Sequence, residues 1–155
     1  MGIKSLILNN WKSYNGQTSI PIKQFAAIIG PNGCGKSNLL DAICFALGVN
    51  SAKLRGKKMQ DQIHKLADGT SAKFASVEII FEKSAEKDLI LSGIVSFKRT
   101  VNALGNSSFE FENKTVSKKN YFEKVFSSNS VGANRDSEAQ QEFSCFPGRH
   151  RFDRL

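Results

Sequence analysis

Residues 30–37 read Gly-Pro-Asn-Gly-Cys-Gly-Lys-Ser, and they stand between an apolar run at residues 25–29 and a helical pattern at residues 37–47. The pattern G-x-x-x-x-G-K-[ST] is matched at all of its fixed positions, which are Gly30, Gly35, Lys36 and Ser37. Glycines let the backbone wrap an anion with its N–H groups, and the following helix adds the positive end of its dipole. The stretch therefore predicts a phosphate-binding loop between a strand and a helix that stops at Gly48.

The loop residues also indicate the ligands. The ammonium of Lys36 is a flexible point charge that reaches β- and γ-phosphates, and the hydroxyl of Ser37 suits the coordination shell of magnesium. We therefore expect ATP and Mg2+ as cofactors, with Ser37 as the metal ligand. The predicted binding residues are Gly30, Pro31, Asn32, Gly33, Cys34, Gly35, Lys36, Ser37 and Asn38. The alternative is a chance glycine-rich turn before a helix.

Hydrolysis requires a second magnesium carboxylate at the end of an apolar strand. Glu82 follows the β-rich stretch 74–81, but Glu78 interrupts that stretch and makes it alternate. We therefore assign Glu82 to a solvated position and predict no catalytic residue in this chain. Residues 91–93, Leu-Ser-Gly, resemble the start of an ABC signature, but a β-rich run follows them, which favours a turn into a strand.

The remaining pattern predicts the fold class. Strands are expected at residues 3–8, 17–22, 25–29, 74–81, 93–101 and 107–111, and helices at 37–47, 59–66 and 116–126. Pro21 favours an edge position for the second strand, and the unbroken apolar run 25–29 favours a strand buried on both faces. This order predicts a mixed α/β fold, in which the phosphate loop and its helix are followed by a mostly antiparallel set of strands.

Charge and composition narrow the partners. The chain of 155 residues is long enough for one domain with a core, and its formal net charge is +8. The densest basic cluster is Lys53, Arg55, Lys57 and Lys58, which favours nucleotide or DNA as a partner, although a solvated basic surface is the alternative. No apolar run approaches the ~20 residues that span a bilayer, so no membrane partner is expected.

Cysteine and histidine usage argues against two other classes of protein. The three cysteines are scattered, which argues against a disulfide framework and fits a reducing compartment. The chain has only two histidines, His64 and His150, and neither has a cysteine at zinc-ligand spacing. A catalytic histidine or a zinc site is therefore not predicted.

Several segments resemble the SMC (structural maintenance of chromosomes) family. Residues 30–48 resemble its P-loop and first helix, and residues 11–14, Trp-Lys-Ser-Tyr, are similar to its "FKSY" segment, with Trp11 in place of Phe. Residues 54–56, Leu-Arg-Gly, resemble its arginine loop. Residues 61–64, Asp-Gln-Ile-His, and residues 113–117 with Tyr121 are similar to the "DLIH" segment and the "GKTV" hairpin of the cohesin branch. The resemblance covers about residues 1–126.

The resemblance implies the N-terminal half of an ABC-type P-loop ATPase head. Its partners would be the C-terminal half of the head, a second SMC head and DNA, on chromosomes in the nucleus. Lys12 and Ser13 would lie near the phosphates, and Arg55, Lys57 and Lys58 near the nucleotide and DNA. The open alternatives are a solvated turn lysine for Lys12 and a member of the basic loop for Arg55. Lacking the rest of the head, this chain is expected to bind ATP weakly and not to turn it over.

The last segment, residues 127–155, departs from the family pattern. Codons allowed for residues 142–155, read one nucleotide later, give NSLVFQGDIDLIA, which resembles the glutamine loop expected there. We therefore interpret the chain as a half-head at residues 1–126 followed by a tail, disordered and without function, that arises from a frame slip beginning at about residues 125–134. A genuine disordered terminus is the alternative.

Three other functions stay open at this point. One is an SMC-like DNA-repair protein or a RecF-type ATPase, against which the hairpin at residues 113–121 argues. Another is a non-catalytic DNA-binding module, which the charge of +8 favours. The last is an inert truncated product.

Overall fold

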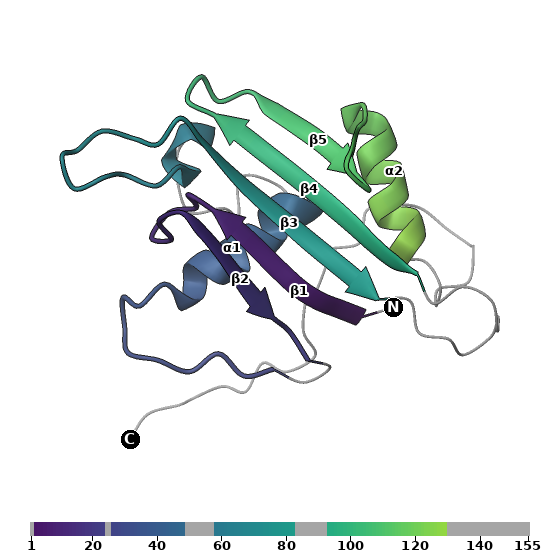
Figure 1. Cartoon of the computed structure of the whole chain (residues 1–155), viewed down its shortest axis with the longest axis horizontal. Helices are drawn as coiled ribbons and strands as arrows, with labels where there is room; N and C mark the ends of the chain where they lie inside the picture. The colour runs from purple at the N-terminus through teal and green to yellow at the C-terminus, as the bar shows by residue number, and fades with distance from the viewer. Residues whose placement is uncertain (1, 24–25, 49–57, 83–92, 130–155) are drawn as a thin grey trace, which may run out of the picture.

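The structure is a computed structural model, which describes residues 2–23, 26–48, 58–82 and 93–129 (Figure 1). Within these ranges a sheet is covered by two helices and one 3-10 helix, which confirms the predicted α/β class. The strands are β1 (Gly2–Asn9), β2 (Gln17–Pro21), β3 (Phe74–Glu82), β4 (Ile94–Asn102), β5 (Ser107–Phe111) and β6 (Lys114–Thr115). The helices are α1 (Lys36–Leu47), α2 (Lys118–Asn129) and the 3-10 helix η2 (Met59–Gln62).

The strands form one sheet in the order β2-β1-β3-β4-β5-β6, and each neighbouring pair is antiparallel. This confirms the antiparallel set of strands that the sequence predicts. Strand β2 lies at one edge, as Pro21 indicates, because proline has no N–H to donate to a further strand. Within the described ranges, the strands at 3–8, 17–22, 74–81, 93–101 and 107–111 are all present with small shifts of their ends.

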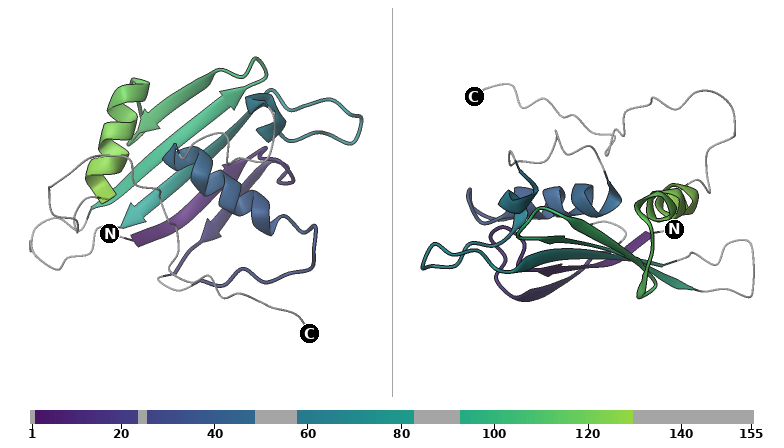
Figure 2. Two further views of the ribbon diagram at one scale, coloured as in Figure 1. Left: turned by 180° about the vertical axis from the view of Figure 1, so that it is seen from behind. Right: turned by 90° about the horizontal axis from the view of Figure 1, so that it is seen from above.

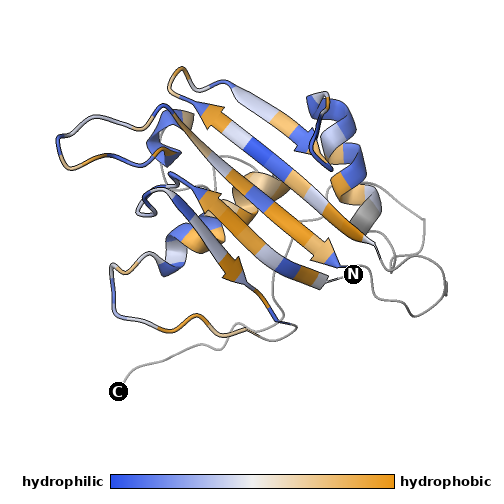
Figure 3. Ribbon diagram, viewed as in Figure 1, coloured by the Kyte–Doolittle hydropathy of each residue, from blue (hydrophilic) through white to orange (hydrophobic). Residues whose placement is uncertain are grey.

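One face of the sheet is apolar and carries the helices. Buried residues alternate with more exposed ones along β3 and β4, so that Val77, Ile79 and Phe97 point to the same side. Figure 3 shows the alternation of hydropathy along the strands, and the view from above in Figure 2 shows both helices on one side of the sheet. Each fully buried large apolar side chain stabilises the fold by about 1.5–3 kcal/mol, so this one layer supplies the core.

The C-terminal end of α1 is fixed to the sheet by two polar side chains. Gly48 ends the helix with a left-handed φ of 73°, as predicted. Arg99 of β4 donates to the carbonyl of Phe45 at 2.9 Å, and the Tyr121 hydroxyl of α2 donates to the carbonyl of Ala46 at 3.0 Å. Burial raises the pKa of Tyr121 well above its usual value, so the phenol stays a donor, and burial lowers the pKa of Arg99. These donors satisfy carbonyls that every helix end leaves open.

Helix α2 begins one residue after Ser117, whose hydroxyl accepts the backbone N–H of Asn120 at 3.2 Å. Ser117 is thus the N-cap, close to the start predicted at residue 116. The helix continues to Asn129, three residues beyond the predicted end at 126. Within the described residues no helix is long and apolar enough to cross a bilayer.

The prediction of a buried strand at 25–29 is wrong for its described part. Residues 26–29 form no strand, and Ile28 and Ile29 are 54% and 92% exposed. A strand that is buried on both faces needs neighbours at its edges and a layer on each side. No strand among the described residues pairs with this segment, which leaves β2 and runs along the outside of the molecule to the phosphate loop (Figure 1).

The helix predicted at residues 59–66 and the position predicted for Glu82 can be compared with the structure. The helix expected at 59–66 is only the 3-10 turn η2, because Ile63 continues as an extended residue that forms a bridge with Trp11. Glu82 is exposed and forms an ion pair with Lys4 at 3.4 Å, so its assignment to a solvated position is confirmed. Leu91 and Ser92 lie outside the described residues, and the strand expected after them is β4.

Substituting Gly48 tests how tightly α1 and α2 pack. A Cβ at Gly48 would lie 1.9 Å from Cε1 of Phe122, whereas a Cβ at Gly69 would meet nothing within 4 Å. Both residues are left-handed, so Gly69→Ala is a control that carries only the backbone penalty of about 1–2 kcal/mol. We expect Gly48→Ala to lower the free energy of unfolding by about 1–3 kcal/mol more, measured by urea denaturation. Equal losses would contradict the contact.

Candidate phosphate-binding site

The loop before α1 takes a shape that depends on glycine. Gly33 and Gly35 have φ angles of 86° and 95°, in the left-handed region that favours glycine. Gly35 is the N-cap of α1, so the N–H groups of the first helical turn open toward the loop. Positive φ angles and a helix N-terminus together are the features by which a backbone surrounds a phosphate.

Two glycines of the loop lie close to neighbouring side chains. A Cβ at Gly35 would lie 2.8 Å from the hydroxyl of Ser13, and a Cβ at Gly30 would lie 2.7 Å from the sulfur of Cys34. Both distances are shorter than real contacts of a Cβ. A side chain at Gly30 or Gly35 would therefore displace the Cys34 thiol or the Ser13 hydroxyl.

Lys36 lies over its own loop. Its ammonium donates to the carbonyls of Gly30 at 2.5 Å and Pro31 at 2.7 Å, and it is 3.8 Å from the sulfur of Cys34. These carbonyls hold the positive charge at the mouth of the loop, where phosphate oxygens would compete for it. Pro31, Asn32, Gly33 and Cys34 are exposed, so the loop is open to solvent.

Ser37 could bind a magnesium ion as a single protein ligand. It stands half-buried in the first turn of α1, beside the loop. The described residues contain no group of three or more His, Cys, Asp or Glu side chains placed to hold a metal. Magnesium in nucleotide sites uses one or two protein oxygens together with phosphates and water, so a single hydroxyl from this part of the chain fits that mode.

A turn at residues 10–14 packs against the start of α1. Trp11 is fully buried, its ring centroid lies 4.8 Å from that of Phe45, and its indole N–H donates to the carbonyl of Asn38 at 2.8 Å. The Asn38 side chain in turn donates to the Ser13 hydroxyl at 2.9 Å. The predicted site residues Ser13 and Asn38 are thus brought together with the loop.

Lys12 forms a buried ion pair with the helix that follows the loop. Its ammonium lies 2.5 Å from the carboxylate of Asp41 on α1, and both side chains are only 9% exposed. This excludes the alternative of a solvated turn lysine. Sequence reasoning missed Asp41, although its place four residues after Ser37 puts it on the same side of the helix, one turn further along.

The segment after η2 packs against the turn at residues 10–14, and an open hollow lies beside them. Backbone bonds join Lys12 N–H to the Gln62 carbonyl and His64 N–H to the Asn10 carbonyl, both at 2.8 Å. His64 Nδ1 lies 2.6 Å from the Lys12 carbonyl, which gives this histidine a structural role. The loop-side hollow, of about 470 Å3, is lined by Lys12, Ser13, Asn38, Asp61, Ile63, His64 and Lys65.

The residues at 61–65 were not predicted as part of a site. The signal available in the sequence was the resemblance of two separate segments, 11–14 and 61–64, to one family. Their antiparallel contact, through the bridge between Trp11 and Ile63, depends on tertiary structure that no local pattern encodes.

Of Arg55, Lys57 and Lys58, the residues predicted to lie near nucleotide and DNA, the structure describes only Lys58. Lys58 is exposed at the start of η2, and its backbone N–H donates to the Asp61 carboxylate at 2.8 Å. Arg55 and Lys57 lie outside the described residues. The predicted place of these residues near nucleotide and DNA therefore stays a prediction.

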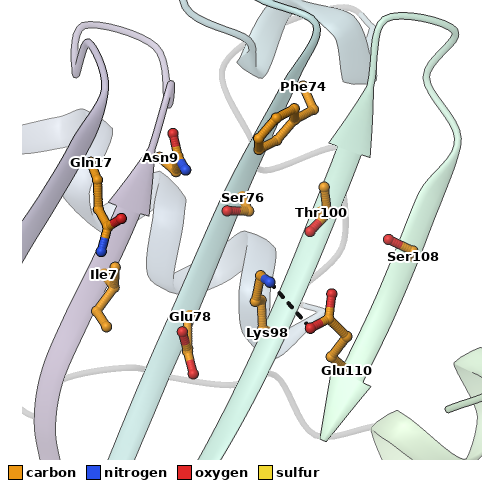
Figure 4. A pocket seen from close by; sticks show the side chains of 10 residues that line it. All are labelled: Ile7, Asn9, Gln17, Phe74, Ser76, Glu78, Lys98, Thr100, Ser108 and Glu110. Atoms are coloured by element: carbon orange, nitrogen blue, oxygen red, sulfur yellow. Dashed lines mark hydrogen bonds and ion pairs between the residues drawn. The ribbon is translucent and has the colours of Figure 1, made fainter. Parts of the chain in front are cut away.

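A second hollow lies away from the loop, on the sheet face opposite the helices (Figure 4). This sheet hollow, of about 420 Å3, is lined mainly by polar side chains of β1, β3, β4 and β5, including an ion pair of Lys98 and Glu110 at 3.1 Å. None of the predicted site residues lines it.

Comparisons with known proteins agree with this geometry. The family model described as "RecF/RecN/SMC N terminal domain" matches residues 2–140. The chain is 37% identical over 123 residues to Structural maintenance of chromosomes protein 1 of Arabidopsis thaliana, covering 77% of this chain and 10% of that protein. It is 36% identical over 125 residues to the Chromosome partition protein Smc of Delftia acidovorans, covering 75% and 10%.

The structural comparison gives the same family. A solved structure from work on ATP-driven dimerization and DNA-stimulated activation of SMC ATPases matches with a TM-score of 0.74 and 30% identity. The match covers 83% of this chain and 80% of that one. The chain spans about a tenth of the length of the curated relatives it matches. It belongs to the RecF/RecN/SMC family, in which it is the N-terminal segment of an SMC-type ATPase head.

Proposed function

We propose that this chain binds ATP with Mg2+ through its phosphate loop, as part of an SMC-type chromosome ATPase. The observation that carries the proposal is the loop itself, in which left-handed Gly33 and Gly35 open the N-terminus of α1 beside the Lys36 ammonium. The backbone from Gly30 to Lys36 would surround the phosphates, and the Ser37 hydroxyl would be a magnesium ligand. The metal would supply charge neutralisation between the phosphates when it is bound.

The loop-side hollow extends the proposed site. Ser13 and Asn38 line this hollow, and Ser13 also approaches Gly35 of the loop. A nucleotide whose phosphates occupy the loop would therefore have its nucleoside directed toward the hollow. Ile63 offers an apolar surface there, and Asp61 and His64 offer polar groups for a base or a ribose.

Replacing Lys36 tests the proposed function directly. Lys36→Ala removes a charge-assisted donor from the phosphates, each such bond contributing about 1.5–3 kcal/mol. We expect the affinity for Mg-ATP to fall by about ten- to a hundredfold in titration calorimetry, with an unchanged circular dichroism spectrum. Lys119→Ala, at an exposed position on α2, is the control. Unchanged ATP binding by a folded Lys36→Ala chain would refute the proposal.

The exposed apolar segment supports a second part of the proposal, namely that a C-terminal head half completes the domain. Ile28 and Ile29 lead into the loop, and Leu40 on α1 is also exposed. Adjacent exposed apolar residues of this kind mark an interface. The completed head would then meet a second SMC head across ATP. Hydrolysis would require residues from outside this chain.

The completed head has a matched test. We expect Ile29→Asp to weaken association with the C-terminal head segment of an SMC1 protein by at least about tenfold, because burying such a side chain contributes about 1.5–3 kcal/mol. Leu104→Asp, at another exposed apolar position, in the turn between β4 and β5, is the control. Co-purification and titration measure the association. Equal behaviour of the two variants would argue against an interface at residues 26–29.

DNA is the proposed polyanionic partner beyond the nucleotide. Helix α2 carries Lys118 and Lys119 in its first turn and no acidic residue there, an arrangement that the helix dipole disfavours. Lys114 on β6 is exposed just before it. Such a placement costs helix stability, so a phosphate-bearing partner gives a reason for it. Lys58, with Arg55 and Lys57, would extend the contact.

Salt dependence tests the DNA contact separately from ATP. Replacing Lys114, Lys118 and Lys119 together with Gln should lower the slope of log K against log salt by up to about 2.7, at about 0.9 for each phosphate contact. Fluorescence anisotropy with a DNA duplex measures this. The same change at the exposed Lys4, Lys23 and Lys73 is the control. An unchanged slope would place the DNA contact elsewhere. DNA binding by an unaltered chain that binds no Mg-ATP would favour a DNA-binding module.

A cohesin-type role in the nucleus, in sister-chromatid cohesion, is the finer proposal. Its support is the pair of segments 61–64 and 113–117, which are similar to the cohesin branch. The competing role is DNA repair or RecF-type loading. Premature separation of sister chromatids after depletion of the protein would support cohesion, and repair defects alone would favour the competitor.

We also propose that the last part of the chain arises from a frame slip that begins at about residues 125–134. Residues 127–129 of the predicted tail are helical, as the end of α2. Residues 130–155 lie outside the described residues. Sequencing the transcript across the codons for residues 120–155 tests it. A single base that restores the reading FQGD would support the proposal, and an intact frame would contradict it.

A further inference from the structure

A buried ion pair joins the turn at residues 10–14 to the helix that carries the phosphate loop. The Lys12 ammonium and the Asp41 carboxylate lie 2.5 Å apart, and each side chain is 9% exposed. Removing two charges from water costs about as much as their attraction returns, so such a pair adds little to stability by itself. A pair in this place is better explained by the geometry it fixes.

The backbone of Lys12 is fixed from the other side. Its φ of 47° is left-handed, which is strained for a residue with a side chain. Its N–H donates to the Gln62 carbonyl at 2.8 Å, and its carbonyl lies 2.6 Å from Nδ1 of His64. The backbone of Lys12 thus holds the wall of the loop-side hollow, while its side chain holds α1.

Ser13, the next residue along the chain, lies against the loop. Ser13 is the residue that a Cβ at Gly35 would meet at 2.8 Å, and its hydroxyl accepts the Asn38 amide at 2.9 Å. The Lys12 ammonium is bound to Asp41. We propose that Lys12 is a positioning residue rather than a phosphate ligand, and that its ion pair with Asp41 sets Ser13 and the hollow against the phosphate loop.

The proposal rests on the proposed binding of ATP, but the chain contains a probe that is independent of nucleotide. Trp11 is the only tryptophan, it is fully buried, and its indole bonds to the Asn38 carbonyl of α1. If the ion pair holds the turn on α1, breaking the pair exposes this indole and shifts its emission to longer wavelength.

The experiment is a double-mutant cycle in the full 155-residue chain, with Lys12→Met, Asp41→Asn and the combination of both. Each single change should weaken Mg-ATP and Mg-ADP alike by about tenfold, the size of a coupling between residues in contact. The double variant should lose no more than either single variant. Both single variants should show the red shift of Trp11. The exchange Lys12→Asp with Asp41→Lys should restore part of the affinity and the emission.

Different results would overturn the proposal. A loss in Lys12→Met that is much larger for Mg-ATP than for Mg-ADP, without a matching loss in Asp41→Asn, would make Lys12 a phosphate ligand. Unchanged Trp11 emission in both folded single variants would show that the pair does not hold the turn. If a single variant fails to fold, Asp41→Glu replaces it, and this variant should retain the emission and lose less affinity than Asp41→Asn.

The proposed function and the positioning role of Lys12 can each fail without the other. If the unaltered chain binds no Mg-ATP, the proposed function fails, while the Trp11 emission of the variants still decides whether the ion pair holds the turn. If the chain binds Mg-ATP and the variants show neither coupling nor a spectral shift, only the positioning role fails.

Discussion

The docking of α1 on the sheet is the constraint on which the candidate site depends. The helix presents the phosphate loop at its N-terminal end, so any error in its position becomes an error in the loop. Apolar contacts alone would let it slide, because they have no direction. The polar contacts at its two ends fix it along its length: Trp11 binds the Asn38 carbonyl at one end, and Arg99 and Tyr121 bind the last carbonyls at the other.

These contacts connect parts of the chain that are distant in sequence. Arg99 lies on β4 between the rings of Phe45 and Phe109, at 4.2 and 5.2 Å, and so joins the helix to the β4–β5 hairpin. Gly48 packs against Phe122 of α2. A partner that displaces α2 would therefore act on the C-terminal end of α1, and through a rigid helix on the loop.

Much of the fold could be predicted from local sequence, for reasons that are local. The alternation along residues 74–81, the β-rich run at 93–101, the loop pattern and the stop at Gly48 each depend on the conformation of their own segment. Lys12 could not be placed, because its partner Asp41 is 29 residues away and its turn is fixed by Gln62 and His64. The buried strand predicted at residues 25–29 was wrong in its described part because an apolar run indicates only a tendency to be buried. It does not show which part of the protein would cover the run.

The departures from local rules fall around the proposed contacts. Ile29 is apolar and exposed where the chain enters the loop, Lys12 is buried in a strained conformation beside it, and Lys118 stands at the end of a helix that disfavours a cation. Sequences that fold well usually satisfy such rules, and violations concentrate where function requires them. A different contact would stabilise each of the three: an apolar surface for Ile29, a fixed counter-charge for Lys12 and a polyanion for Lys118. Asp41, which supplies the fixed counter-charge, lies within the described residues, on the helix that carries the phosphate loop.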